Sequence, residues 1–353
     1  MLGLSALAGA VLFAWSGVYN VAASRGHWWV TDVVLRFAME SSVRTHAPDV
    51  EPPELNDPDL VLLGAGHYYS GCAYCHGAPG DPIDPVASQM LPSPPDLSER
   101  SAQWTDTQLF WLVKHGLKYA GMPAWPAQDR DDEVWALVAF LRTLPDLDEA
   151  GYRRLVHGPE RTEAPPGAAV LAAGSPDDVQ SCVRCHGDAD APRSALVPRI
   201  QGQPVEVLSR ALRDYASGRR HSGVMQQMAA DLKSPEIDAL AAYYASLPRI
   251  AADHAPDAEA NFEAGRALAE QGLRSADLPS CLSCHGNDGL PIFPRLLGQN
   301  ARYMEEQLRA WKRGGKGTSD ADRLMGNIAQ RLSDEQIRDV SAWLAAQPVD
   351  GVR

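Results

Sequence analysis

The pattern of apolar and polar residues along the chain predicts an all-helical protein with a long uncharged run at its start. Residues 2–24 carry no charged side chain. Further on, apolar residues recur every three to four positions, which is the spacing of one face of an α-helix. From this pattern and from helix-capping residues we expect helices at residues 59–69, 105–119, 131–144, 237–247 and 337–344.

The uncharged run is long enough to be a membrane anchor. At about 1.5 Å per residue it can cross a hydrocarbon core of about 30 Å, and Trp28 and Trp29 follow it, as is typical of a membrane interface. A cleaved signal peptide is the alternative, with residues 21–23 as a small-residue cleavage site. We favour the uncleaved anchor because the run is long for a signal peptide, although the basic residues Arg25 and Arg36 follow it and none precedes it.

Three copies of one pentad, C-x-x-C-H, are the main chemical signal. They are Cys72-Ala73-Tyr74-Cys75-His76, Cys182-Val183-Arg184-Cys185-His186 and Cys281-Leu282-Ser283-Cys284-His285. This motif is typical of a c-type haem attachment site, where two thiols one helical turn apart bond to the porphyrin and the histidine binds iron. All six cysteines belong to the pentads, so none remains for a disulfide. The sequence therefore predicts three covalently bound haem c groups.

A methionine follows each pentad at a distance that suits the sixth iron ligand. Met122 lies 46 residues after His76 in a proline-rich loop. The other two candidates, Met225 and Met325, follow their histidines at 39 and 40 residues, inside a stretch that repeats itself. Met/His ligation raises the reduction potential of a haem. The alternatives are methionines that only fill the core and, near Met225, the rival ligands Met228 and His221.

The histidine of each pentad also needs a partner for its second ring nitrogen, because a ligating histidine usually donates that N–H to a carbonyl oxygen. A proline occupies an equivalent place after each pentad. We expect three carbonyl–histidine pairs: Pro95 with His76, Pro198 with His186 and Pro294 with His285.

Composition and charge narrow the class of partner. The formal net charge is −13, which argues against nucleic acid and favours a basic protein partner. Residues 57–150 hold 14 acidic and 5 basic side chains, whereas residues 169–250 hold 9 of each. The first haem region is therefore the better candidate for a docking surface steered by charge, although a solvated acidic surface gives the same count.

The chain resembles the class I cytochrome c family in the order of its features: pentad after a helix, ligand methionine, closing helix. The last two units resemble tandem di-haem periplasmic cytochromes, and the first resembles single-domain cytochromes with a G-M-P-A-W ligand loop, here residues 121–125. The resemblance implies an all-α fold: three class I cytochrome c domains behind an N-terminal transmembrane or signal-anchor helix. The expected divisions are 1–24 (anchor), 25–56 (juxtamembrane segment and linker), 57–147 (domain 1), 148–168 (linker), 169–250 (domain 2) and 256–350 (domain 3).

The family resemblance also implies low-spin haem, electron transfer and no bond chemistry, so we expect a carrier and no enzyme. The leading hypothesis is a membrane-tethered tri-haem cytochrome on the periplasmic side of a bacterial inner membrane, carrying single electrons toward a terminal oxidase from a quinol-oxidising or substrate-oxidising complex. The alternative is a cytochrome subunit of a membrane-bound periplasmic dehydrogenase. We expect no nucleic acid and no small-molecule substrate. A haem peroxidase with an open sixth position and a zinc or thiol-redox protein are the remaining readings.

Overall fold

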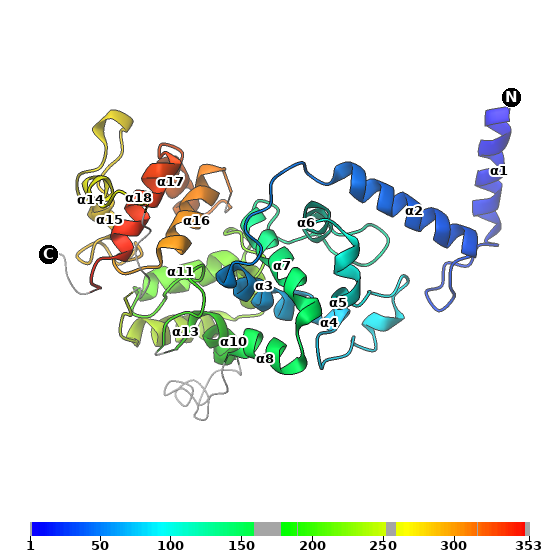
Figure 1. Cartoon of the computed structure of the whole chain (residues 1–353), viewed down its shortest axis with the longest axis horizontal. Helices are drawn as coiled ribbons and strands as arrows, with labels where there is room; N and C mark the ends of the chain where they lie inside the picture. Colours follow the sequence, from blue (N-terminus) through cyan, green and yellow to red (C-terminus); the bar gives the residue numbers. More distant parts are fainter. Residues whose placement is uncertain (1, 159–177, 189, 252–258, 316, 350–353) are drawn as a thin grey trace.

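A computed structural model describes residues 2–158, 178–188, 190–251, 259–315 and 317–349. Within these residues the regular structure is helical, and extended pairing is limited to isolated bridges between loops. The expected all-α fold is therefore confirmed. Figure 1 shows three groups of helices following one another along the molecule, with α1 and α14 near opposite ends.

The membrane-spanning helix expected at residues 1–24 is not found among the described residues. The first helix, α1, covers Leu2–Ser16, which is 15 residues. It stops because Gly17 adopts a positive φ of 67°, which cannot continue a right-handed helix. At about 1.5 Å per residue α1 reaches only about 22 Å. Among the described residues, no helix is both long and apolar enough to cross a membrane.

The first helical group begins with α2, Trp29–His46, and centres on the crossing of α3, Pro58–Gly71, with α7, Asp131–Thr143. The α3 N-terminus is capped by the Asp57 carboxylate, and α6, Asp106–His115, begins with a Thr105–Gln108 capping box. The core of this group lies between α3, α6 and α7. Short helices complete it: α4 (Ala73–His76), η1 (Ala87–Gln89), α5 (Leu97–Arg100), η2 (Ser101–Gln103) and η3 (Leu144–Asp146).

Gly64 allows α3 and α7 to approach closely, because a Cβ at this position would clash with the carbonyl oxygen of Ala136 in α7. The third helical group repeats this device. There Gly265 of α14 faces the carbonyl oxygen of Asp339 in α18, and a Cβ would clash in the same way. Both crossings therefore bring a pentad-preceding helix against a closing helix.

The expected linker 148–168 is partly helical. Its described part contains α8, Glu149–His157, whose Tyr152 and Val156 are each 1% exposed in the core of the first group. The sequence did not indicate this helix, because most of its residues are polar or charged; Leu155 is the other side chain that packs against the core. Residues 159–168, and the start of the expected second domain at 169–177, lie outside the described residues.

The second and third groups share one order of helices. The second contains α10, Asp178–His186, and then α11 (Val205–Ala216), α12 (Met225–Ala230) and α13 (Ser234–Ser246). The third contains α14 (Phe262–Gln271), η4 (Arg274–Ala276), α15 (Leu282–His285), α16 (Ala301–Lys312), α17 (Asp320–Ala329) and α18 (Asp334–Ala345). The sequence P-R-x-x-G-Q occurs at residues 198–203 and again at 294–299. In both groups the helix that follows it packs on the closing helix, α11 on α13 and α16 on α18. The two copies of the repeated sequence therefore also share the same packing of one helix on the closing helix.

Candidate haem sites

Each pentad lies on a helical turn that presents its two cysteines and its histidine together. The first forms the four-residue α4, the second closes α10, and the third forms α15. Gly77 and Gly187, directly after the first two histidines, have φ of 70° and 72°, so the chain leaves the helix at that point. Each histidine is therefore the last residue of the helix that carries its second cysteine.

The predicted carbonyl partners of the three histidines are confirmed. The Nδ1 atom of His76 lies 2.8 Å from the carbonyl oxygen of Pro95. The same pair of atoms is 3.1 Å apart in His186 and Pro198, and 2.8 Å apart in His285 and Pro294. Because a carbonyl oxygen only accepts, Nδ1 carries the proton in each ring, and Nε2 keeps its lone pair for a metal.

Burial reinforces the neutral form of these imidazoles. It lowers the pKa of His76, His186 and His285 below the ordinary value of 6.5, while the proline carbonyl opposes part of that shift. A neutral imidazole is the form that binds a metal ion. Each histidine is therefore prepared as a ligand before any metal arrives.

The six thiols are all free and partly exposed. Burial raises the pKa of the Cys72 thiol to about 12 and that of Cys281 to about 11. Both thiols stay protonated at neutral pH, so neither is a ready thiolate ligand for an ion. Nor do the described residues contain a cluster of three or more His, Cys, Asp or Glu suited to an ion. Two thiols and one oriented imidazole in each C-x-x-C-H pentad fit a covalently attached haem c better than zinc.

The first candidate methionine lies in a loop, as its sequence predicts. Met122 is between α6 and α7, and its carbonyl oxygen accepts from the Leu117 amide at 3.1 Å. Tyr119 and Gly121 both have positive φ, 63° and 69°. A second methionine, Met90, packs against this loop, since a Cβ on Gly121 would clash with its terminal methyl group. Sequence reasoning missed Met90 because it lies in a loop with no repeat to compare.

The other two candidates lie on helices. Met225 is the first residue of α12, and Met228 is one turn further along the same helix. Met325 lies within α17. The remaining candidate, His221, is held by the Asp129 carboxylate, 2.8 Å from its Nδ1. The structure thus places His221 in a contact between the first two groups.

The second pentad packs directly on the helix that leads to the first. Arg184 donates to the Ser70 hydroxyl at 2.9 Å, and its guanidinium lies 4.5 Å from the centre of the Tyr69 ring. The sulfur of Cys185 would be 3.5 Å from a Cβ on Gly66 in α3. The attachment sites of the first two groups are therefore joined through a single helix.

Comparison with known proteins agrees with this geometry. Residues 60–141 match the family model for cytochrome c oxidase, cbb3-type, subunit III, and residues 262–347 match that for cytochrome c. The thiosulfate dehydrogenase electron acceptor of Thiomonas intermedia is 36% identical over 181 residues, covering 50% of this chain and 83% of that protein. The chain is a multi-domain class I cytochrome c.

Two further relatives of this cytochrome c support the same class. The thiosulfate dehydrogenase electron acceptor of Stutzerimonas stutzeri is 34% identical, covering 52% of this chain and 88% of the relative. Cytochrome c4 of Thiocapsa roseopersicina is 33% identical, covering 46% and 85%. This cytochrome c is a multi-haem electron carrier and an electron-transfer protein, as the sequence predicted.

Proposed function

We propose that this cytochrome c is the electron-accepting partner of a periplasmic dehydrogenase, with thiosulfate as the substrate that the dehydrogenase oxidises. The observation that carries the proposal is the similarity to two proteins named as thiosulfate dehydrogenase electron acceptors, 36% and 34% identical over most of their own length. These relatives favour the dehydrogenase reading over the leading hypothesis of a free carrier to a terminal oxidase.

The proposal includes three haem c groups held by the pentads. The thioether cysteines are Cys72, Cys75, Cys182, Cys185, Cys281 and Cys284, and the axial ligands are His76 with Met122, His186 with Met225, and His285 with Met325. When bound, each haem supplies a one-electron iron couple. The protein orients each imidazole through a proline carbonyl and surrounds the pentad with apolar helices.

The proposed domains follow the apolar cores. The first core joins α3, α6, α7 and α8, so we extend the first domain from 57–147 to His157. Separate cores lie within the expected second and third domains, 169–250 and 256–350. Each proposed domain then has one pentad and its own apolar core.

An order of electron flow follows from the contacts between the domains. Hydrogen bonds join the third and second domains at the residues beside Pro198 and Pro294. The second domain packs on the first where Cys185 lies against Gly66. The first domain matches an oxidase subunit over residues 60–141. We therefore place electron entry from the dehydrogenase at the last two domains and exit toward an oxidase at the first. Because bacterial thioether attachment takes place outside the cytoplasmic membrane, the chain would act in the periplasm.

The test is reduction of the oxidised, haem-loaded protein by thiosulfate in the presence of a purified catalytic thiosulfate dehydrogenase subunit. The absorbance change of the haems on reduction is the signal. We expect reduction at least tenfold faster with the dehydrogenase than with thiosulfate alone, and slower at high salt because the chain carries a net charge of −13. Reduction by a quinol-oxidising complex, with none by the dehydrogenase, would contradict the proposal.

A further inference from the structure

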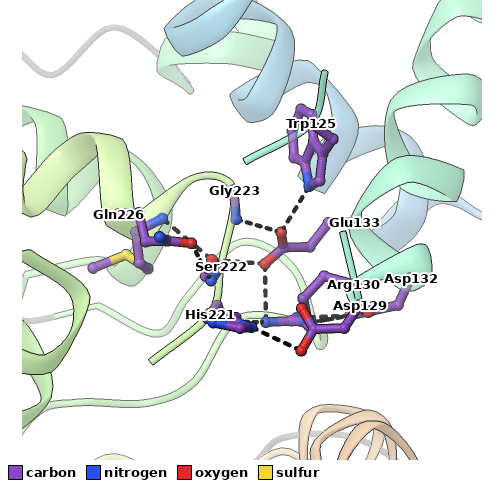
Figure 2. Close-up of polar contacts among 10 residues, drawn as sticks. Trp125, Asp129, Arg130, Asp132, Glu133, His221, Ser222, Gly223 and Gln226 are labelled. Atoms are coloured by element: carbon purple, nitrogen blue, oxygen red, sulfur yellow. Dashed lines mark hydrogen bonds and ion pairs between the residues drawn. The ribbon is translucent and has the colours of Figure 1, made fainter. Parts of the chain in front are cut away.

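A buried carboxylate joins the first two domains at the segments that carry their methionines. Glu133, in the first turn of α7, is 3% exposed. Figure 2 shows its carboxylate between Trp125 on one side and residues 222–223 on the other. The Trp125 indole donates to it at 3.2 Å, the Ser222 hydroxyl at 2.6 Å and the Gly223 amide at 2.6 Å. We call these four residues the Glu133 junction.

Both sides of the Glu133 junction lie within three residues of a candidate ligand. Trp125 follows Met122 by three residues, and Ser222 precedes Met225 by three. The Met225 amide donates to the Ser222 hydroxyl oxygen at 3.2 Å, so the hydroxyl connects the carboxylate to the backbone of the ligand itself. One side chain of the first domain thus accepts hydrogen bonds from residues three positions away from each of two candidate methionines.

The segment that contains Trp125 and the segment that contains Gly223 are in direct contact. A Cβ on Gly223 would clash with the Trp125 ring, so the glycine lies directly against the indole. Arg130 forms an ion pair with Glu133 at 3.0 Å and donates to the carbonyl oxygen of His221 at 3.1 Å. Since Arg130 is 7% exposed, the ion pair and the hydrogen bonds lie in a buried contact where an unmatched donor is costly.

We propose that Glu133 is a positioning residue that sets the orientation of the Met122 and Met225 segments together. A change at Glu133 then alters the midpoint potentials of the first and second haems at the same time. This inference rests on the proposed methionine ligands. A buried ion pair that served packing alone would need no hydrogen bonds to the ligand-bearing segments of two domains, and apolar side chains are often as stable in its place. The three donors from Trp125, Ser222 and Gly223 give the carboxylate its directional role.

The test compares Glu133→Gln with the wild-type holoprotein by a spectroscopic redox titration. The glutamine keeps the size of the side chain but offers an amide N–H to sites where the carboxylate accepts hydrogen bonds. We expect the midpoint potentials and the sulfur-to-iron charge-transfer bands of the first and second haems to shift together, while those of the third stay unchanged. Trp125→Phe should shift the first haem alone, and Ser222→Ala the second alone.

The matched control is Asp339→Asn. Asp339 is also 3% exposed, but it lies in α18 of the third domain, where it accepts from the Asn261 amide at 2.8 Å. This variant should leave the first two haems unchanged. Equal shifts of all three haems in Glu133→Gln, or no shift of the first two, would overturn the inference. Should Glu133→Gln fail to fold, Trp125→Phe and Ser222→Ala decide the matter, because unchanged haems in both would also overturn it.

Two further variants separate this inference from the proposed ligands. Met122→Leu and Met225→Leu should each abolish one charge-transfer band. If either band survives, the ligand assignment fails whatever Glu133→Gln shows. If both bands disappear and Glu133→Gln leaves the first two potentials in place, the ligands stand and the positioning role of Glu133 is wrong.

Discussion

The side chain of Gln299 forms two hydrogen bonds with the backbone of Arg199, in the preceding domain. Its Oε1 accepts from the Arg199 amide at 2.9 Å, and its Nε2 donates to the Arg199 carbonyl oxygen at 2.9 Å. The pair Gln203 and Arg295 repeats both bonds in the opposite direction, each at 2.9 Å. The two arginines directly follow the prolines whose carbonyl oxygens pair with His186 and His285. Each glutamine is therefore hydrogen-bonded to the residue next to the proline that orients the histidine of the other domain.

The first prediction is a crossed effect of these glutamines. Gln299→Ala removes the bonds to Arg199 and should shift the midpoint potential of the second haem. Gln203→Ala removes those to Arg295 and should shift the midpoint potential of the third. Gln299→Ala also removes the bond from the Asn300 amide, so it loses three hydrogen bonds and Gln203→Ala loses two. Each variant should lower the free energy of unfolding by about 1–3 kcal/mol. Redox titration and urea unfolding of both variants provide the measurement. An effect of each variant on its own domain's haem alone would contradict the prediction.

The second prediction concerns the close approach of α3 and α7. Gly64→Ala places a Cβ against the Ala136 carbonyl oxygen, where the backbone has no room to move. We expect a loss of about 3 kcal/mol in the free energy of unfolding, the upper range for overpacking. Gly9→Ala is the control, since Gly9 lies in α1 with nothing within 4 Å of its Cβ position. Denaturant unfolding monitored by circular dichroism should distinguish the two variants. Equal unfolding midpoints would contradict the claim that Gly64 is needed for the close approach of α3 and α7.

The third prediction is an acid sensitivity that depends on His67. This residue is 3% exposed, and burial, aided by the positive charge of Arg130, lowers its pKa from 6.5 to about 3. Between these values the unfolded chain binds a proton that the folded chain does not. Stability should therefore fall as the pH drops from 6.5 toward 3, by up to about 1.4 kcal/mol per pH unit from this group.

His67→Gln should remove that contribution. Urea unfolding of both proteins at pH 7, 6, 5 and 4 gives the two slopes, and the wild type should show the steeper one. The Nδ1 atom of His67 has no hydrogen-bond partner in the described structure, so the substitution breaks no hydrogen bond at that atom. Parallel slopes would mean that His67 binds protons equally in the folded and unfolded chains, so that its pKa is not lowered on folding.

The fourth prediction concerns the three methionine ligands. Met122→Leu, Met225→Leu and Met325→Leu should each lower the midpoint potential of one haem and remove one sulfur-to-iron charge-transfer band. Met90→Leu and Met228→Leu are the matched controls, since Met90 packs on the Met122 loop and Met228 shares α12 with Met225. If a control removes a band that its partner leaves intact, the ligand in that domain is assigned wrongly.

The local features of the sites were predictable from the sequence because they repeat. The C-x-x-C-H pentad occurs three times, and a proline follows each histidine, although at 19, 12 and 9 residues. The pairing of His76 with Pro95 was predicted from the need of a ligating histidine for a carbonyl partner, and it was confirmed. The helices at 59–69 and 131–144 were also expected, and they appear as Pro58–Gly71 and Asp131–Thr143. Capping residues and apolar spacing are local signals, which is why they were readable.

The contacts between domains were not predictable, because they depend on residues distant in sequence. Nothing near Glu133 marks it as the partner of Ser222, 89 residues further on. The length of the first helix was not predictable for a different reason. Apolar composition measures how long a span could be, but Gly17 ends the helix after 15 residues. Likewise, the core contacts of Tyr152 and Val156 placed a helix where composition indicated a linker.

The central claim is that this chain binds three haems through three pentads. Intact mass spectrometry of the denatured protein tests it most directly, because thioether-linked haem survives denaturation whereas haem held only through iron is lost. We predict a mass equal to that of the chain plus three haems, with one haem on each peptide that contains residues 72–76, 182–186 or 281–285. A mass with fewer than three haems, or a haem peptide outside these residues, would contradict the account.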